Sequence, residues 1–363
     1  MSADEFSWKH ILGLIAVQTD LDNGQAQWAM NEIMSGQATA AHIAAFVMGL
    51  RVKNETVEEI TGMVEAILAN AERVTLGYDA VDIVGTGGDG AHTVNVSTMA
   101  ALTVAGLGIP VLKHGNRAIS SRAGTADVLE ALGVALNIPV DDVAQCVAQA
   151  GIAFCFAPAH HPGFRHAGPV RKELGIPTVF NVLGPLCNPG QPQASLLGCS
   201  DLRLAPLMAH VQQERGFKSI VVRADSGIDE IATLGLTQIW DVTTDQVRHD
   251  VFDPSVFDLV PASADDLRGA EAQFNATVVR ELFSGNQEGK FAGIRDVVAV
   301  NAAAALVAFD ATRDSHVYGS PEITFSARLR VALADAYRSI DTGLASHALE
   351  KLVTASSELA THS

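Results

Sequence analysis

Positive charge is scarce in this sequence. It has 24 Lys and Arg residues against 41 Asp and Glu residues, which gives a formal net charge of −17, and no stripe rich in Lys or Arg stands out. Because such a field opposes binding to nucleic acid or to an anionic membrane, we expect neither as a partner. A small substrate is favoured. An anionic substrate would need a locally positive site, built from a few Lys, Arg and backbone N–H groups or completed by a bridging cation.

Cysteines are few, and segments that would direct the chain out of the cytoplasm are missing. The cysteines show neither C-x-x-C spacing nor a Cys/His ligand cluster, so we interpret them as reduced core thiols: Cys146, Cys155, Cys187 and Cys199. The N-terminus is acidic where a signal peptide would be basic, and we recognise no apolar run long enough to span a bilayer. These absences predict a cytoplasmic protein.

Apolar residues, by contrast, are abundant. They make up 48% of the 363 residues, enough for a large core, and the length predicts two parts with a cleft between them. Between Trp8 and about Glu72 apolar residues recur at helical spacing, which predicts a helical block. Within it, Thr56 and Glu59 fit the N-cap and capping-box positions of a helix.

After Gly77 the pattern changes to short apolar runs, glycine-rich turns and helices, which is typical of an α/β domain with a mainly parallel sheet. The predicted fold class is therefore α/β, with a small helical N-terminal domain and a large α/β domain. We place the helical domain at residues 1–76, joined by about 168–189, and the α/β domain at 77–167 and 190–363. In the tail, a strand-like piece is expected around Ile323.

A glycine-rich segment follows the first predicted strand. Residues 85–90 read Gly-Thr-Gly-Gly-Asp-Gly, and residues 95–98, Asn-Val-Ser-Thr, open a helix. Glycines let the backbone approach a ligand closely, and a helix start offers free N–H groups to an anion. We interpret the segment as a phosphate cradle, although its spacing matches neither a P-loop nor a dinucleotide fingerprint. A plain glycine-rich turn is the alternative.

Two further strand ends carry polar residues. Lys113, Asn116 and Arg117 follow one strand, at the carboxyl end where open α/β sheets bind ligands. Lys113 suits a phosphate or pyrophosphate, whereas Arg117 would bind it bidentately or pair with a neighbouring carboxylate. Asp229 and Glu230 follow another strand. Paired acids beside a phosphate site suit magnesium, and solvated acids at a helix start are the alternative.

Other candidate residues are less specific. His160, His161 and His166 lie close together in the sequence, but neither matching metal ligands nor a nucleophile accompanies them, so we assign them no catalytic role. Arg171 begins a predicted helix and, taken alone, would be a surface charge.

These segments, in this order, resemble the anthranilate phosphoribosyltransferase family over almost the whole chain. The similarity is carried by Phe46-Val47-Met48-Gly49-Leu50-Arg51, Gly85-Thr86-Gly87-Gly88-Asp89-Gly90, Thr93-Val94-Asn95-Val96-Ser97-Thr98, Lys113-His114-Gly115-Asn116-Arg117, Ala126-Asp127-Val128-Leu129-Glu130-Ala131-Leu132-Gly133, Phe156-Ala157-Pro158, His161-Pro162, Pro169-Val170-Arg171, Phe180-Asn181-Val182-Leu183-Gly184-Pro185-Leu186, Asp229-Glu230 and Asn301-Ala302-Ala303.

The resemblance implies an activity and a set of partners. The activity is transfer of the phosphoribosyl group from phosphoribosyl pyrophosphate to anthranilate, giving N-(5-phosphoribosyl)anthranilate and pyrophosphate in tryptophan biosynthesis, with Mg²⁺ as cofactor. The fold would be shared with pyrimidine nucleoside phosphorylases, and a homodimer would form through the helical domain. The glutamine amidotransferase of anthranilate synthase is a further partner that the resemblance raises.

The resemblance also implies residue roles. The catalytic candidates are Lys113, Asn116 and Arg117. Phosphoribosyl pyrophosphate would be held by Gly85, Gly88, Asp89, Thr93, Asn95, Val96, Ser97, Thr98, Lys113, His114, Gly115, Asn116, Arg117, Ala118, Ile119, Ser120, Ser121 and Thr125. Anthranilate would meet Gly85, His114, Asn116 and Arg171, and magnesium would be served by Ser97, Asp229 and Glu230.

Some positions depart from the commonest family pattern. Arg122-Ala123-Gly124-Thr125 stands where small residues and often a serine occur, and Thr125 falls on a position that contacts pyrophosphate. A threonine hydroxyl can still donate, so we expect an altered fit and retained function. Phe164 and His166 also depart from the pattern, in the stretch that leads to Arg171.

Two rival functions can be distinguished from the sequence. A nucleoside phosphorylase of the same architecture is disfavoured by the intact Lys113 to Arg117 segment and by Asp229-Glu230. A paralogue that binds nucleic acid should have a basic groove and altered anthranilate positions, whereas here the net charge is −17 and both Asn116 and Arg171 are present.

Overall fold

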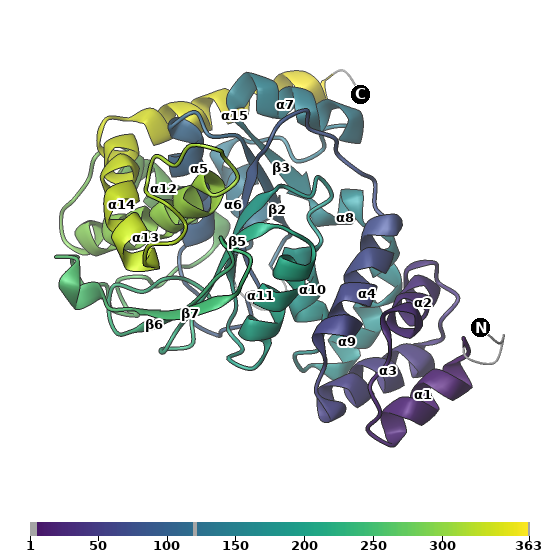
Figure 1. The fold of residues 1–363 in the computed structure, drawn as a ribbon. Coiled ribbons are helices and arrows are strands. Elements are labelled where there is room, and N and C mark those ends of the chain that lie inside the picture. Colours follow the sequence, from purple (N-terminus) through teal and green to yellow (C-terminus); the bar gives the residue numbers. More distant parts are fainter. Residues whose placement is uncertain (1–5, 119–121, 362–363) are drawn as a thin grey trace.

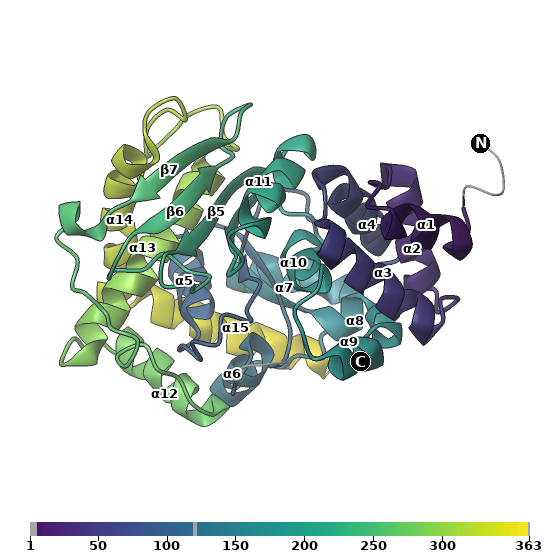
Figure 2. The same cartoon turned by 90° about the horizontal axis from the view of Figure 1, so that it is seen from below.

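A bundle of helices occupies one end of the molecule in both views of the ribbon (Figures 1 and 2). The structure is a computed structural model that describes residues 6–118 and 122–361. The bundle comprises α1 (Trp8–Ala16), α2 (Asn23–Met34), α3 (Ala40–Lys53) and α4 (Val57–Ala69). The expected capping box of α4 is confirmed, because Thr56 Oγ1 accepts the Glu59 N–H and the Glu59 carboxylate accepts the Thr56 N–H.

A later segment of the chain returns to this bundle. It consists of α8 (Ala157–His160), the 3₁₀ turn η2 (Pro162–His166), α9 (Gly168–Leu174) and α10 (Phe180–Leu186). Helix α9 contacts α3, α10 contacts α4, and η2 contacts α2. The returning segment therefore begins before residue 168, the start that we expected from the sequence. The exact domain limits stay a prediction.

One seven-stranded sheet forms the centre of the larger part, in the order β3-β2-β1-β4-β5-β6-β7. The first five strands in this order are parallel, whereas β6 and β7 are antiparallel additions at one edge. The bounds are β1 (Val81–Gly85), β2 (Val111–Gly115), β3 (Ile152–Phe156), β4 (Ala194–Gly198), β5 (Lys218–Ala224), β6 (Thr237–Asp241) and β7 (Arg248–Phe252). The chain proceeds from β1 to β2 and β3 on one side and then returns to β4 on the other. Such a topological switch point between β1 and β4 leaves a crevice outside the carboxyl ends of the strands.

Successive residues of a strand point to opposite faces of the sheet, and the two faces bury separate cores. In β4, Leu196 belongs to a core with the helices of the larger part, and Leu197 to a core shared with the bundle. The remaining helical elements are α5 (Val96–Gly106), α6 (Thr125–Leu132), η1 (Val140–Asp142), α7 (Val143–Ala150), α11 (Leu204–Glu214), η3 (Pro254–Val256), α12 (Ala272–Phe283), α13 (Lys290–Asp310), α14 (Phe325–Asp341) and α15 (Leu344–Ala360).

Helix α13 corrects one statement drawn from the sequence. By length and composition its 21 residues are apolar enough to cross a membrane, although we recognised no such run. In the structure 83% of its most apolar window is buried inside the protein, where α13 packs on α5, α14 and strands β1, β4 and β5. The helix is apolar all round because it is surrounded by protein, as expected for a core helix.

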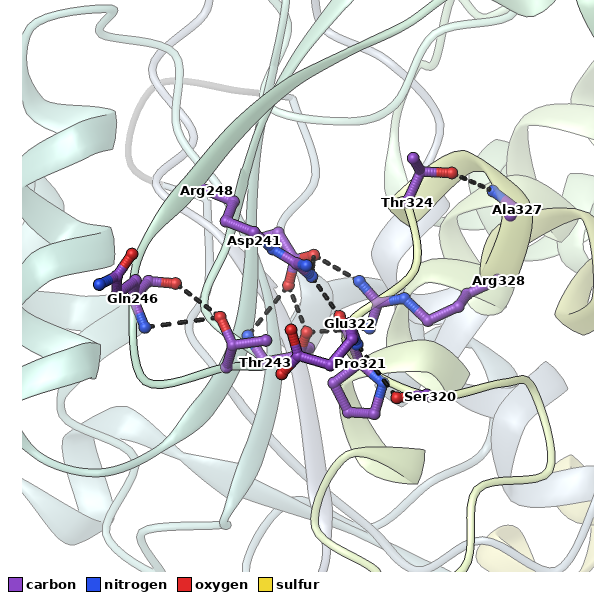
Figure 3. A network of polar contacts seen from close by, with 11 residues as sticks. Asp241, Thr243, Gln246, Arg248, Ser320, Pro321, Glu322, Thr324, Ala327 and Arg328 are labelled. Atoms are coloured by element: carbon purple, nitrogen blue, oxygen red, sulfur yellow. Dashed lines mark hydrogen bonds and ion pairs between the residues drawn. The ribbon is translucent and has the colours of Figure 1, made fainter.

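The prediction of a strand around Ile323 is wrong. Thr324 is instead the N-cap of α14, and its hydroxyl accepts the N–H of Ala327. Close by, a buried network ties α14 to the antiparallel edge of the sheet (Figure 3). Arg328, which is 1% exposed, binds the Asp241 carboxylate and donates to Thr243 Oγ1 at 2.9 Å, while Arg248 binds the same carboxylate from β7 at 2.7 Å.

We expect Arg328→Met to lower the free energy of unfolding by about 3 kcal/mol, because removing one member of a buried ion pair leaves the other poorly compensated. Arg248 still pairs with Asp241 in this variant, which keeps the loss near the low end for such pairs. The matched control is Arg338→Met, whose exposed pair with Asp335 should contribute less than about 1 kcal/mol. Urea denaturation followed by tryptophan fluorescence measures both, and equal losses would contradict the assignment.

Candidate active site

The acidic pair lies at the switch point of the sheet. Gly85 and Gly198, the last residues of β1 and β4, are register partners, and Asp229 sits against both. A Cβ on Gly198 would lie 1.7 Å from the backbone oxygen of Asp229, and one on Gly85 would lie 2.1 Å from its Oδ2. Oδ2 also accepts the Gly87 N–H at 2.7 Å. The two glycines thus make room for Asp229, Gly198 for its backbone and Gly85 for its carboxylate, at the carboxyl ends of β1 and β4.

Negative charge is concentrated here. Burial and the nearby Asp89 carboxyl raise the pKa of Asp229 to about 6, against the hydrogen bond from Gly87. Burial and then Asp229 raise the pKa of Glu230 well above its usual value, against Lys113 and a backbone hydrogen bond from Ser97. Carboxylates crowded in this way are relieved by a cation, so their chemistry fits a divalent metal.

The described residues hold no group of three or more His, Cys, Asp or Glu side chains arranged to bind a metal by themselves. A cation held by these two carboxylates would therefore need further oxygen ligands from elsewhere. This is the usual arrangement for Mg²⁺, which keeps several waters and bridges one or two carboxylates to substrate phosphates.

Lys113 lies close to Asp229 and Glu230 and is not exposed. Its side chain is buried, and its Nζ donates to the Ile83 backbone oxygen and, at 3.4 Å, to Ser97 Oγ. Burial lowers the pKa of Lys113, while Asp82, Glu230 and Asp229 act in the opposite direction. The lysine, Ser97 and the acidic pair are therefore brought together, as the sequence predicted for three strand ends of one sheet.

The glycine-rich segment spans the space between the strand end and α5. Gly87, Gly88 and Gly90 have φ angles of 61°, 74° and 70°, which favour glycine. Asn95 is the N-cap residue of α5, and its Oδ1 accepts from the buried Asn275 at 2.9 Å. The segment therefore has the conformation expected for a cradle of backbone N–H groups at a helix start.

The remaining positions assigned to phosphoribosyl pyrophosphate border the same region. Thr93 forms an isolated bridge with Arg268, and Thr98, in the first turn of α5, is buried with no partner for its hydroxyl among the residues that the structure describes. Thr125 begins α6, next to the strand end at Gly115. Ile119, Ser120 and Ser121 lie outside the described residues.

For Arg117 the structure shows the pairing that the sequence left open. Its guanidinium binds Asp127 and Glu130, each at 2.9 Å, and stands 46% exposed. Asn116 is exposed, and its Oδ1 accepts the Arg117 N–H, whereas Ala118 N–H donates to Asp127. Arg117 thus fastens this loop to α6 in the structure, and a direct role for it in catalysis stays a prediction.

Arg171 lies on α9, in the segment that packs on the helical bundle. Its guanidinium stands 5.3 Å from the Phe180 ring centre and has neither a hydrogen bond nor an ion pair among the residues that the structure describes. Burial lowers the pKa of Arg171, although a guanidinium stays charged at any physiological pH. Arg171 is therefore a half-buried cation without a counter-ion in the described part of the chain, not the fully exposed surface charge that its helix position alone suggested, and such a cation is available to bind an anion.

A chain of aromatic contacts connects Arg171 with the strand end of β2. Phe180 meets Phe164 at 5.9 Å between ring centres, Phe164 meets His161 at 5.7 Å, and His161 meets His114 at 5.2 Å. Phe164, one of the departures from the family pattern, therefore belongs to a continuous wall of rings. Such a wall suits a planar aromatic ligand whose anionic end lies on Arg171.

The two histidines have their tautomers fixed by backbone oxygens. His114 Nδ1 lies 3.1 Å from the Gly184 oxygen and His161 Nε2 lies 2.8 Å from the Cys187 oxygen, so each of these nitrogens is the donor. His114 Nε2 and His161 Nδ1 are then bare acceptors, and both are buried without a partner within residues 6–118 and 122–361. Burial lowers the pKa of both rings, that of His161 to about 4, so both are neutral at pH 7.

His161 should make stability depend on pH. Folding lowers its pKa from about 6.5 to about 4, so the folded state binds the proton less well and its advantage is lost as pH falls through this window. Between pH 7 and pH 4 we expect wild type to lose about 2 to 3 kcal/mol more than His161→Gln, whose amide can replace the ring donor. Urea denaturation at both pH values measures the difference. Equal losses would contradict the buried neutral ring.

Sequence reasoning missed two residues that the structure brings to this place. His161 was assigned no role because neither metal ligands nor a nucleophile accompany it in the sequence, and its actual neighbours, His114 and Cys187, come from distant segments. Asn181 lies on α10, and its Nδ2 would be 3.6 Å from a Cβ on Gly88, so its amide faces the glycine-rich segment. Its Oδ1 accepts the Thr178 N–H, which leaves Nδ2 directed away. The position of Asn181 directly after Phe180, within a motif the resemblance contained, was the available signal.

Comparison with known proteins covers both parts of the chain. The glycosyl transferase family, a/b domain, matches residues 77–346, and the glycosyl transferase family, helical bundle domain, matches residues 9–71. The anthranilate phosphoribosyltransferase of Arthrobacter sp. (strain FB24) is 47% identical over 348 residues, 96% of this chain and 95% of that protein. The enzyme of the same name from Salinispora arenicola (strain CNS-205) is 48% identical and covers 96% of each chain.

Solved structures give the same result. The anthranilate phosphoribosyltransferase of Thermus thermophilus superimposes with a TM-score of 0.86 at 34% identity, covering 96% of this chain and 99% of that one. The Saccharomyces cerevisiae enzyme, in complex with phosphoribosyl pyrophosphate and Mg, superimposes with a TM-score of 0.84 at 27% identity, covering 98% and 99%.

Proposed function

This chain belongs to the anthranilate phosphoribosyltransferase family and catalyses transfer of the phosphoribosyl group from phosphoribosyl pyrophosphate to anthranilate. We propose that the two substrates meet between Arg171 and the Asp229–Glu230 pair. The observation that carries the proposal is the Arg171 guanidinium, half-buried beside Phe180 with no anionic partner among the described residues. Anthranilate supplies what is missing, namely a carboxylate on a flat aromatic ring.

We assign the anthranilate path to the wall that runs from Arg171 to His114. The carboxylate binds Arg171, and the ring packs along Phe180, Phe164 and His161. The bare acceptors His114 Nε2 and His161 Nδ1 take hydrogen bonds from the amine, which orients its nitrogen toward the glycine-rich segment. We assign Gly85 and Asn116 to the far end of this path.

We assign phosphoribosyl pyrophosphate to the cradle at the carboxyl edge of the sheet. Backbone N–H groups of the glycine-rich segment and the start of α5 hold the phosphates, and the Asn181 amide faces the same segment from α10. Lys113 supplies positive charge from below, and its contacts with Ile83 and Ser97 keep its ammonium fixed. A fixed cation stabilises developing negative charge without reorganisation during the reaction.

We propose that Asp229 and Glu230, with Ser97, hold Mg²⁺ together with substrate oxygens. Burial raises the pKa of both carboxylates, with a further contribution from Asp89 at Asp229 and from Asp229 at Glu230, and this crowding of negative charge fits a divalent cation. When bound, Mg²⁺ neutralises charge on the leaving pyrophosphate.

The reaction displaces pyrophosphate from the anomeric carbon of the ribose by the anthranilate amine. The new C–N bond forms from the amine lone pair as the C–O bond breaks, its electrons leave with pyrophosphate, and the amine then loses one proton. An aromatic amine needs no strong base, so alignment between the bundle and the sheet edge supplies much of the rate enhancement. The apolar rings of the wall exclude water that would otherwise hydrolyse the activated sugar.

We also propose the wider setting of the enzyme. A homodimer would form through the helical bundle, the enzyme would act in the cytoplasm, and the glutamine amidotransferase of anthranilate synthase is a candidate partner. No nucleic-acid partner is expected at a net charge of −17.

Loss of anthranilate fluorescence in the presence of phosphoribosyl pyrophosphate tests the activity. We expect a loss that requires both substrates and Mg²⁺ and that equals the pyrophosphate released. Phosphate-dependent release of base from thymidine or uridine, with no loss of anthranilate, would support a nucleoside phosphorylase instead.

A further inference from the structure

A buried asparagine in α13 holds the backbone that carries the acidic pair. Asn301 is fully buried among the alanine and valine residues of this helix. Its Oδ1 accepts the Ile231 N–H at 3.0 Å, and its Nδ2 donates to the Ile231 oxygen at 3.0 Å. Nδ2 also donates to the oxygen of Val297, one turn earlier in α13, at 2.8 Å. One side chain therefore satisfies both backbone groups of Ile231, as a neighbouring strand would.

Burying the Asn301 amide costs free energy unless the amide forms such hydrogen bonds. A buried amide needs hydrogen bonds, and an alanine would fit the composition of α13 at no cost in polar desolvation. The Asn301 amide satisfies its own polar atoms through Ile231 and Val297 alone. Its exchange for an apolar side chain would leave both backbone groups of Ile231 buried and unpaired.

Ile231, the residue that Asn301 holds, lies directly next to the acidic pair in the chain. Ile231 follows Glu230 without an intervening residue, and β5 ended at Ala224, so the acidic pair lies on a connection outside the sheet. On its other side this connection is fixed by Asp229, which accepts the Gly87 N–H. The segment around Glu230 is thus held at two points, before it through the Asp229 side chain on Gly87 and after it through the Ile231 backbone on Asn301.

We infer that Asn301 is a positioning residue for the divalent-cation site, which it serves by fixing the backbone that carries Asp229 and Glu230. The inference rests on the proposed function, because it concerns the acidic pair that we assign to the cation. Asn301 touches neither substrate nor metal, so its loss should weaken cation binding far more than anthranilate binding.

The test compares wild type with Asn301→Leu, Asn301→Ser and the control Ser339→Ala. Leu keeps the approximate volume without any hydrogen bond, and Ser leaves room for water, so Asn301→Ser carries the test if Asn301→Leu does not fold. Ser339 is a buried hydroxyl that donates to the Thr103 oxygen at 2.7 Å, away from the acidic pair. The control measures the effect of losing a buried hydrogen bond elsewhere.

Two readouts are needed, and neither depends on turnover. Binding of Mn²⁺ in the presence of phosphoribosyl pyrophosphate, followed by electron paramagnetic resonance, should weaken roughly tenfold or more in the folded Asn301 variants and less than twofold in Ser339→Ala. Hydrogen exchange of the metal-free protein should be faster at residues 228–232 in the Asn301 variants alone.

The outcomes separate the two claims. Unchanged Mn²⁺ affinity in a folded Asn301 variant would overturn the positioning role and leave the proposed function standing. Equal weakening in Ser339→Ala would also overturn it, because a general loss of rigidity would then account for the effect. Wild type that binds no Mn²⁺ with phosphoribosyl pyrophosphate would instead count against the cation site itself.

Discussion

Arg171→Ala should raise the KM for anthranilate roughly 100-fold, with the KM for phosphoribosyl pyrophosphate changed less than about threefold. The reason is that the guanidinium meets no anion in the described part of the protein, so its whole interaction is available to the substrate carboxylate. Truncating one member of a half-buried, hydrogen-bonded charge pair costs about 3 kcal/mol, which corresponds to this factor. Steady-state kinetics with each substrate varied in turn measures both constants.

Lys172→Ala is the matched control for this variant. Lys172 is the next residue of α9 and is exposed, so its loss removes one positive charge from the same helix without altering the wall of rings. We expect KM values within about twofold of wild type, as for an isolated surface charge. Equal effects of Arg171→Ala on both substrates would show that the residue does not recognise anthranilate.

The second large effect concerns the acidic pair. Asp229→Asn combined with Glu230→Gln keeps the shape of both side chains but removes their charge, and we expect kcat/KM to fall about 1000-fold. The Mg²⁺ concentration for half-maximal activity should rise in parallel, because amides are weaker ligands than carboxylates. Titrating Mg²⁺ at fixed saturating substrates measures this shift.

Asp225→Asn serves as control for the double variant. Asp225 is exposed in the same connection after β5, and its carboxylate accepts from Gln238. It should retain the wild-type Mg²⁺ profile. An unchanged profile in the double variant itself would remove Asp229 and Glu230 from the cation site.

Much of the fold could be predicted because it is encoded locally. The Thr56 capping box, the glycines after β1 and the polar residues after β2 and β5 are all local patterns, and parallel strands bring their carboxyl ends to one edge. Lys113 and the acidic pair could be placed together for this reason. The parallel sheet does not by itself predict β6 and β7, which extend it at one edge in the antiparallel sense.

What could not be predicted depends on contacts between distant segments. Arg171 has the pattern of a surface residue on a short helix, and its isolation from the described carboxylates is a property of the assembled crevice. The bare acceptors of His114 and His161 exist because the oxygens of Gly184 and Cys187, on another segment, bind the opposite ring nitrogens. Asn301, in a helix that by composition could span a membrane, is understood once Ile231 is seen beside it.

In the site that we propose, both parts of the chain contribute residues. The sheet edge supplies the cradle and the acidic pair, while α9 and α10, which pack on the bundle, supply Arg171, Phe180 and Asn181. Gly88 and Asn181 face each other where the two sets meet. On this proposal, the alignment of the amine with the activated sugar depends on how the bundle and the sheet are held together.

The most direct test of this account is a crystal structure of the protein with phosphoribosyl pyrophosphate, Mg²⁺ and 4-fluoroanthranilate, the last of which appears in a complex of the Saccharomyces cerevisiae enzyme. We predict its carboxylate on Arg171, its amine facing His114 and His161, and pyrophosphate with the cation on Asp229 and Glu230. Binding of the aromatic compound away from Arg171, or of the cation away from the acidic pair, would contradict the account.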